Sequence, residues 1–214
     1  MSTTKNKLNL RDFWEKGYES EITPFDIEEP DSWIAELEKQ GKIKGRVLDS
    51  GCGPGRTALY LSSLGYEVVG MDISNNAIER AKRKSAQKNC STQFLQADMC
   101  TLTDYEEQFD TVVDIGCLHS LFEEQLRRAY AITLHRICRK GATLYIRAFS
   151  NANPTGIHDT GHALPALSEE QIRTAFPIDQ WNIKDLTHKK IDMLADGKEM
   201  SKVFCWFAEI KRKN

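Results

Sequence analysis

The spacing of hydrophobic positions changes along the chain, and the changes divide the predicted elements into three regions. In the first region, apolar side chains recur with helical spacing and predict helices over residues 10–20 and 30–40. Asp31 or Ser32 is the expected N-cap of the second helix, whose apolar side chains then share one face. The chain therefore opens with two short amphipathic helices.

In the second region, from Arg46 to about residue 150, short β-branched apolar runs alternate with helical patterns. The predicted strands cover residues 46–50, 66–73, 92–98, 109–116 and 142–149. The predicted helices between them cover residues 55–64, 75–88 and 123–139. Ser74 is the expected N-cap of the second of these helices, and Gly141 follows the third as its C-terminal stop. Nearly continuous apolar strands that alternate with helices indicate a parallel sheet covered on both faces.

In the third region the pattern becomes a loop, a helix and two late strands. The loop covers residues 151–167, and the helix after it begins at Ser168, in a segment with capping-box spacing. Strands at 181–193 and 201–211 meet near Asp196-Gly197, a strong hairpin signal. The sequence thus predicts an α/β fold with a Rossmann-like, doubly wound sheet. This sheet has seven strands, is mostly parallel and ends in a C-terminal antiparallel hairpin.

Length and composition fit a single domain over residues 1–214. No apolar run is long enough to cross a bilayer and the N-terminus lacks a signal-peptide core, so we expect a cytoplasmic protein without membrane contact. A net charge of -2 gives no footprint for nucleic acid. The basic cluster of Arg80, Lys82, Arg83, Lys84 and Lys88 is interpreted as a solvated helix face. The six scattered cysteines predict neither a disulfide framework nor a zinc site.

The most informative segment is the glycine-rich turn in residues 47–61, VLDSGCGPGRTALYL. A buried strand ends at Asp49, the turn holds Gly51, Gly53 and Gly55, and a helix follows. Glycines let the backbone turn sharply and approach a ligand, and the helix N-terminus adds unpaired N–H groups. The spacing is G-x-G-x-G rather than the G-x-G-x-x-G of dinucleotide-binding folds. Asp49 would be poorly placed beside a pyrophosphate and suits a cationic ligand, such as an ammonium group.

Two further aspartates end the next two predicted strands. Asp72 lies 21 residues after Gly51, where an α/β fold places a carboxylate that accepts hydrogen bonds from ribose hydroxyls. Asp98 could accept a hydrogen bond from an adenine amino group, and the Met99 backbone N–H lies beside it. Ligands of such sheets bind at the carboxyl edge of the strands. Three acids at this edge therefore predict a nucleoside site.

The segments VLDSGCGPG, VVGMDIS, LQADM and FDTVVDIGCLHSL resemble, in order and spacing, successive motifs of the class I S-adenosylmethionine-dependent methyltransferases. The resemblance covers residues 45–150, and the C-terminal hairpin agrees with it. It implies S-adenosylmethionine as cofactor, with its methionine part at the glycine-rich turn, its ribose at Asp72 and its adenine at Asp98. The cofactor-binding residues expected in this way are Asp49, Gly51, Gly53, Gly55, Asp72, Ile73, Asp98, Met99, Gly116 and Trp14.

In this family the end of the fourth strand borders the methyl group, and here it reads Asp114-Ile-Gly-Cys-Leu-His119. A general base helps when the acceptor is a hydroxyl, a thiol or a protonated amine. His119 is the candidate catalytic residue, because an ordinary histidine pKa of about 6.5 permits proton uptake near neutral pH. Alternatively, His119 caps the next helix or orders the loop. Cys117 follows a glycine instead of the proline found in cytosine C5 methyltransferases, so a buried structural thiol is expected.

Two segments remain to build the acceptor pocket. In small-molecule methyltransferases such as the thiopurine, thiol and heterocycle enzymes, an aromatic N-terminal segment folds over the cofactor as a lid. The resemblance implies such a helical lid over residues 1–40, with Tyr18 and Phe25 as substrate-binding residues beside Trp14. The alternative is that the shared face of Trp14 and Tyr18 simply packs in the core.

The second segment is the loop after the fifth strand, residues 151–165, which is long for a compact domain. Arg147, His158 and His162 are the expected substrate contacts in and before this loop. His158, Asp159 and His162 resemble a metal-ligand set, but no regular helix is predicted there and no metal is expected. Residues 151–214 are thus assigned to the acceptor loop, a helix and the hairpin.

The prediction is an enzyme that transfers a methyl group from S-adenosylmethionine to an S, N or O nucleophile of a small molecule. The Asn/Asp-Pro-Pro-aromatic run of amino-group DNA methyltransferases is absent, and no appended domain is seen that would hold a nucleic acid. Three alternatives are a methyltransferase acting on protein or RNA, a catalytically idle regulatory protein that binds the cofactor, and a nicotinamide oxidoreductase. The glycine spacing argues most strongly against the last of these.

Overall fold

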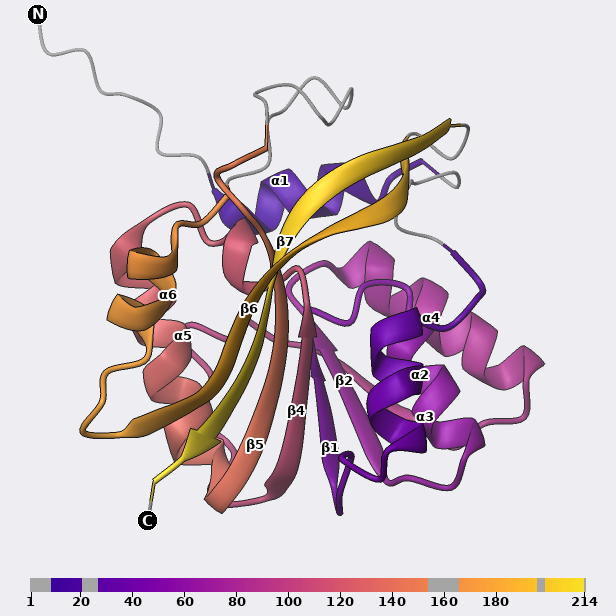
Figure 1. Cartoon of the computed structure of the whole chain (residues 1–214). Helices are drawn as coiled ribbons and strands as arrows, with labels where there is room; N and C mark the ends of the chain where they lie inside the picture. Colours follow the sequence, from indigo (N-terminus) through magenta and orange to yellow (C-terminus); the bar gives the residue numbers. More distant parts are fainter. Residues whose placement is uncertain (1–8, 21–26, 154–165, 196–198, 214) are drawn as a thin grey trace, which may run out of the picture.

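The computed structural model describes residues 9–20, 27–153, 166–195 and 199–213, and its centre is a seven-stranded sheet (Figure 1). The strands are β1 (Val47–Ser50), β2 (Val68–Asp72), β3 (Gln93–Gln96), β4 (Phe109–Ile115), β5 (Cys138–Phe149), β6 (Trp181–Ala195) and β7 (Glu199–Arg212). Their order is β3-β2-β1-β4-β5-β7-β6. The first five strands pair in parallel, whereas β7 pairs antiparallel with both β5 and β6. The predicted fold class is confirmed.

Helices cover both faces of the sheet. They are α1 (Leu10–Gly17), α2 (Ser32–Lys39), α3 (Arg56–Ser63), α4 (Asn75–Gln87), the short 3-10 helix η1 (Leu118–Ser120), α5 (Glu124–Ile137) and α6 (Glu169–Ala175). Apolar side chains of α2, α3 and α4 form one core cluster with the sheet, and those of α5 and α6 form another. Helix α1 lies across the top edge of the sheet in Figure 1. Among the residues described, no helix is long and apolar enough to span a bilayer.

The predicted helix caps form as the sequence indicates. The carboxylate of Asp31 accepts the Trp33 N–H at 3.1 Å, and Ser74 Oγ accepts the Ala77 N–H at 3.2 Å. Ser168 and Gln171 form the reciprocal bonds of a capping box. Because these bonds satisfy N–H groups that the first helical turn leaves without partners, they fix where each helix begins.

Two predicted boundaries are wrong. Helix α5 ends at Ile137 and passes directly into β5 at Cys138, so Gly141 lies inside a strand, at a φ of 77°, and does not end the helix. Strand β3 ends at Gln96, which places Asp98 in the loop beyond it. Both errors arise because long-range pairing extends or shortens an element beyond its local pattern. The predicted turn at Asp196-Gly197 lies outside the described residues.

The β6–β7 hairpin extends past the carboxyl edge of the parallel strands (Figure 1). Strand β5 pairs with β7 only as far as Cys205, opposite Phe149, although β7 already begins at Glu199. The earlier part of β7 therefore pairs with β6 alone. This overhang brings side chains of the hairpin above the sheet edge, where the functional site lies.

Candidate functional site

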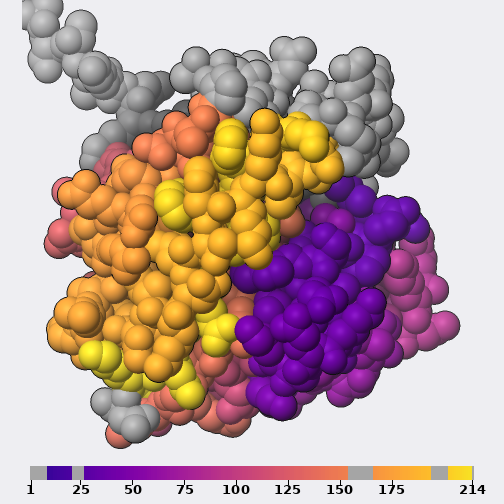
Figure 2. Space-filling view, viewed as in Figure 1, coloured from indigo at the N-terminus to yellow at the C-terminus, as the bar shows by residue number. Residues whose placement is uncertain are grey.

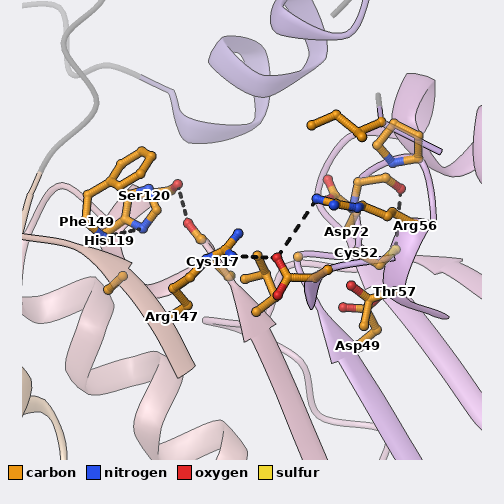
Figure 3. Close-up of a pocket in the computed structure, with 18 of the residues that line it drawn as sticks. Asp49, Cys52, Arg56, Thr57, Asp72, Cys117, His119, Ser120, Arg147 and Phe149 are labelled. Carbon is orange, nitrogen blue, oxygen red and sulfur yellow. Dashed lines mark hydrogen bonds and ion pairs between the residues drawn. The ribbon is translucent and has the colours of Figure 1, made fainter. Parts of the chain in front are cut away.

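A cavity of about 880 Å³ opens at the carboxyl ends of β1, β2 and β4. Its wall is formed by α1, α2, the glycine-rich turn, the ends of β2, β4 and β5, and the β6–β7 hairpin. In Figure 2, indigo N-terminal atoms lie directly beside the orange and yellow atoms of the hairpin. In Figure 3, Asp49 and Asp72 lie at one end of the cavity and His119 and Phe149 at the other.

The glycine-rich turn forms the floor at the acidic end of the cavity. Gly51 and Gly53 line it with φ angles of 67° and 51°, in the left-handed region that favours glycine. A Cβ added to Gly53 would lie 2.9 Å from Tyr18 Oη, so a side chain would fill the space between turn and α1. Gly55 lies outside the cavity wall. It precedes α3, where an added Cβ would meet the Phe94 ring at 2.8 Å.

The carboxylate of Asp72 holds the turn and the start of α4 together. Its Oδ2 accepts the Gly53 N–H and its Oδ1 accepts the Ser74 N–H, each at 2.9 Å. Asp98 lies across the cavity edge, and its Oδ1 accepts the Cys100 N–H at 2.8 Å. Asp72 and Asp98 line the cavity, as do Ile73 and Met99. The structure therefore gathers these sequence-predicted residues around one end of the cavity.

Three buried aspartates give this end a negative character. Burial raises the pKa of Asp49 to about 7, although its Oδ2 accepts the Ala58 N–H at 2.9 Å. Burial likewise raises the pKa of Asp72 and of Asp114 to about 6. The neighbouring carboxylates Asp114 and Asp72 add to the rise at Asp49 because like charges disfavour ionisation. A bound cation would relieve this repulsion.

Helix α1 covers the same end of the cavity, and Trp14 of this helix and its C-cap residue Tyr18 belong to the wall. Glu15 holds the helix in place, since its Oε2 accepts Ser74 Oγ at 2.7 Å and the Asn76 N–H at 3.3 Å. Arg80 of α4 donates to the Tyr18 carbonyl at 2.6 Å. Its interpretation as part of a solvated face is wrong, because Arg80 is only 7% exposed beneath this contact. Neither Glu15 nor Arg80 could be assigned from helical periodicity alone.

The opposite end of the cavity is walled by aromatic and aliphatic side chains that the sequence interpretation missed. The Trp33 and Phe207 rings meet edge to face, with their centroids 4.9 Å apart, and Phe207 shares a core cluster with Phe149. Lys189 Nζ lies 5.7 Å from the centre of the Phe207 ring. Ile191 and Met193 of the hairpin complete this wall. The sequence does show the alternation of side chains along β6. It does not show that the hairpin extends past the sheet edge, which is what places one face of β6 at the cavity.

Arg147 and His119 both line this apolar end. Arg147 forms an ion pair with Asp31 Oδ2 at 2.5 Å, and Arg56 approaches the same oxygen at 3.9 Å. His119 lies in η1 and is 5% exposed. Its Nδ1 accepts the Phe149 N–H at 3.3 Å. Gly116, one turn earlier, also lines the cavity.

Three sequence-predicted substrate contacts, Phe25, His158 and His162, lie outside the described residues, as does Asp159. Within the described part of the chain, no three His, Cys, Asp or Glu side chains are arranged to hold a metal ion. Cys52 is buried and Cys117 is partly buried in the cavity wall, and desolvation raises the pKa of each thiol well above its usual value. Thiols held protonated in this way are poor nucleophiles.

The donor set at the acidic end suits S-adenosylmethionine. A sulfonium and an ammonium group favour surrounding carboxylates, and ribose and adenine need acceptors of the kind that Asp72 and Asp98 provide. The turn brings its backbone to the cavity wall at Gly51 and Gly53, and Gly53 packs so closely under Tyr18 that no side chain fits there. The cavity is also large enough to hold a nucleoside together with a second small molecule.

Comparison with known proteins agrees with this geometry. Residues 47–141 match the methyltransferase domain family. The chain is 32% identical over 197 residues to the 2-heptyl-1-hydroxyquinolin-4(1H)-one methyltransferase of Mycobacteroides abscessus, across 88% of this chain and 85% of that protein. It is 43% identical over 117 residues to the uncharacterized methyltransferase C1348.04 of Schizosaccharomyces pombe, across 55% of this chain and 80% of that protein.

A solved structure described as "Conversion of a Disulfide Bond into a Thioacetal Group during Echinomycin Biosynthesis" superposes with a TM-score of 0.84 at 31% identity. The superposition covers 96% of this chain and 92% of that one. The similarity therefore includes the N-terminal helices and the C-terminal hairpin as well as the central sheet. The chain belongs to the class I S-adenosylmethionine-dependent methyltransferases, and S-adenosylmethionine is its cofactor.

Proposed function

We propose that this methyltransferase acts on an S, N or O nucleophile of a small, largely apolar ring compound. The observation that carries the proposal is the cavity itself, which runs from the acidic glycine-rich turn to the wall of Trp33, Phe149 and Phe207. A flat apolar acceptor suits aromatic walls of this kind. Two relatives support a small acceptor by their names, one acting on a hydroxyquinolone and the other on a disulfide during echinomycin biosynthesis.

We assign the cofactor to the acidic end. Asp72 is expected to accept the ribose hydroxyls, and Asp98 with the Met99 N–H to bind adenine, while the backbone of Gly51 and Gly53 lies along the methionine part. When bound, S-adenosylmethionine supplies a methyl group made electrophilic by the sulfonium. The chain's own contribution is to align the acceptor with that group and to exclude water, as α1 and the hairpin close the cavity.

The test is methyl transfer from radiolabelled S-adenosylmethionine to a panel of thiols, phenols, N-hydroxy heterocycles and amines. We expect label in one or more apolar ring compounds, with Ile191→Ser raising the acceptor KM while cofactor affinity is unchanged. Lys184→Ser, on the same strand but away from the cavity wall, is the matched control. Transfer only to RNA or protein from cell extracts would contradict a small-molecule acceptor.

The buried aspartates predict an unusual dependence of stability on pH. Asp49, with a pKa raised to about 7, holds a proton in the folded protein at pH values where the unfolded chain has released it. The folded state then binds more protons, so the free energy of unfolding falls as pH rises from about 4 to about 7. Thermal unfolding without cofactor should show wild type losing stability over this range relative to Asp49→Asn.

Cofactor affinity should depend on pH with the opposite sign. A cationic ligand favours the ionised aspartates, so affinity should weaken as pH falls through about 6, where Asp72 takes up a proton. Calorimetry at pH 5.5 and 7.5 measures the change. Two results together would exclude this electrostatic account. The difference in unfolding temperature between wild type and Asp49→Asn would be the same at every pH, and cofactor affinity would not change with pH.

Glu15 is proposed as the residue that keeps α1 closed over the cofactor. Glu15→Ala removes the acceptor of Ser74 Oγ and of the Asn76 N–H, a charge-assisted contact whose loss costs about 1.5 kcal/mol, or roughly tenfold in a rate or equilibrium. We therefore expect S-adenosylhomocysteine to dissociate about tenfold faster in stopped-flow displacement. Asp12→Ala, exposed on the same helix, should behave like wild type. Equal dissociation rates in all three proteins would show that Glu15 does not control the lid.

A further inference from the structure

The imidazole of His119 is fixed in one orientation by its surroundings. Its Nδ1 accepts the backbone N–H of Phe149 at 3.3 Å, and its ring packs against the Phe149 ring with centroids 4.5 Å apart. Gly116 leaves the space that the imidazole occupies, since a Cβ there would lie 3.1 Å from His119 Cε1. A ring that is 5% exposed between these contacts cannot turn over without displacing β5 or η1.

This orientation determines which nitrogen carries the proton. A neutral imidazole has one N–H and one lone pair, and the lone pair of Nδ1 is directed at the Phe149 N–H. The proton of His119 therefore resides on Nε2. To act as a base through Nε2, the ring would have to carry a proton on Nδ1, where it would face the donor of Phe149. Two donors in contact are unfavourable, and a catalytic histidine held in the wrong tautomer loses about 10⁴-fold in rate.

The other carboxylates and the thiol near His119 are engaged elsewhere. Asp31 pairs with Arg147 and caps α2, and Asp114 accepts hydrogen bonds from Tyr130 Oη at 2.8 Å and from the Cys117 N–H at 2.7 Å. Burial keeps the Cys117 thiol protonated by raising its pKa. Asp49, Asp72 and Asp98 line the acidic end of the cavity, and the other carboxylates on the described part of its wall, those of Glu29, Glu36 and Asp192, belong to exposed residues.

Cations, by contrast, are placed at this end of the cavity. Arg147, on the strand that carries Phe149, lines the wall with its guanidinium against Asp31. Lys189 lies over the face of Phe207 on the hairpin. Together with the Nε2–H of His119, these groups place N–H donors at this end of the cavity. Such an environment stabilises an anion and disfavours removal of a proton by the protein.

We infer that the acceptor is a ring compound whose S–H, O–H or N–OH group ionises on its own near neutral pH, and that His119 positions the site as a donor and is not the general base. The inference rests on the small-molecule activity proposed above. The acceptor's lone pair forms the bond to the methyl carbon, and the carbon–sulfur bond breaks with its electron pair going to sulfur. An anionic acceptor leaves as a neutral methyl ether or thioether, so the enzyme has no proton to remove.

The test compares two phenols that fit the cavity and differ by several units in pKa, for example with and without a nitro substituent. An unsubstituted phenol ionises near pH ~10, far above an ordinary histidine. We expect kcat/KM to rise with pH up to an inflexion that follows the pKa of each acceptor. His119→Asn keeps an acceptor near the position of Nδ1 for the Phe149 N–H, and should retain turnover within about tenfold with the same inflexions.

The inference is overturned if the pH profiles of both acceptors share one inflexion, because a group of the protein would then take the proton. This holds whether or not the inflexion is still present in His119→Asn. A loss of turnover of roughly 10²-fold or more in His119→Asn with a flattened pH profile would identify His119 as the base.

NMR of ¹⁵N-histidine protein with S-adenosylhomocysteine separates this inference from the proposed function. His119 should carry its proton on Nε2 at pH 7.5 even if no small acceptor is methylated. A proton on Nδ1 would overturn the role given to His119.

Discussion

The Asp31→Ala variant is expected to unfold roughly 8–24 °C below wild type. Asp31 is 3% exposed, pairs with the nearly buried Arg147 at 2.5 Å and caps α2. Without Asp31, the guanidinium groups of Arg147 and Arg56 lose the carboxylate that they share. Removing one partner of a buried ion pair lowers the free energy of unfolding by about 3–5 kcal/mol. The lost N-cap contributes about 1 kcal/mol. For a chain of this length each kcal/mol lowers Tm by about 2–4 °C.

Asp31→Asn and Arg147→Met separate the two roles of Asp31. Asparagine keeps an oxygen that can cap α2 but loses the charge, so it should show most but not all of the loss. The double variant Asp31→Asn/Arg147→Met should recover stability, because removing both partners leaves no buried unpaired charge. If Asp31→Ala unfolds within about 1 kcal/mol of wild type, the ion pair does not hold α2 against β5.

Asp72→Asn is expected to weaken S-adenosylmethionine binding by roughly 10–100-fold, the effect of losing about 1.5–3 kcal/mol of charge-assisted hydrogen bonding. The carboxylate has a second function in the protein, since it accepts the N–H groups of Gly53 and Ser74. An asparagine side chain has one acceptor oxygen for these two donors, so the glycine-rich turn should also loosen. Calorimetric titration with S-adenosylmethionine and S-adenosylhomocysteine measures the change.

Asp104→Asn is the control for Asp72→Asn, because Asp104 is an exposed aspartate in the loop after β3 and lies outside the cavity wall. It should bind the cofactor like wild type. Thermal unfolding of both variants separates a loosened turn from a lost ligand contact. If Asp72→Asn binds the cofactor within twofold of wild type, Asp72 does not bind the ribose.

The residues that we propose for the cofactor could be grouped from the sequence because their positions are set locally. Each relevant residue lies at or just after the end of a strand, or in a turn whose glycines have positive φ angles, as at Gly51 and Gly53. Parallel strands bring their carboxyl ends to one edge, so residues distant in sequence such as Asp72 and Asp98 converge without further information. Asp98 joins them although β3 ends before it.

The acceptor end depends on contacts between elements that are far apart in the chain. The wall of Trp33 and Phe207 forms only when the hairpin passes over α2. Arg147 was expected at the substrate and does line the cavity, but its partner Asp31 lies more than a hundred residues away in the sequence. Periodicity describes one element at a time and carries no information on such pairs.

The same reason explains Arg80 and His119. A basic residue within a basic helix is normally solvated, but the carbonyls of Tyr18 and Ser20, just after α1, accept hydrogen bonds from Arg80. The identity of His119 suggested a base, whereas its hydrogen bond to the Phe149 N–H, thirty residues later, supports the donor role that we propose for it. The residue type indicates which interactions a side chain can make. Tertiary contacts, which sequence patterns do not show, determine which of these interactions form.

A crystal structure of the protein with S-adenosylhomocysteine is the most direct test of a single cavity with a cofactor end and an acceptor end. We expect the ribose hydroxyls at Asp72, adenine beside Asp98, and the sulfur directed toward the wall that carries His119 and Phe149. A nucleoside bound elsewhere, or a sulfur facing away from that wall, would contradict this division of the cavity.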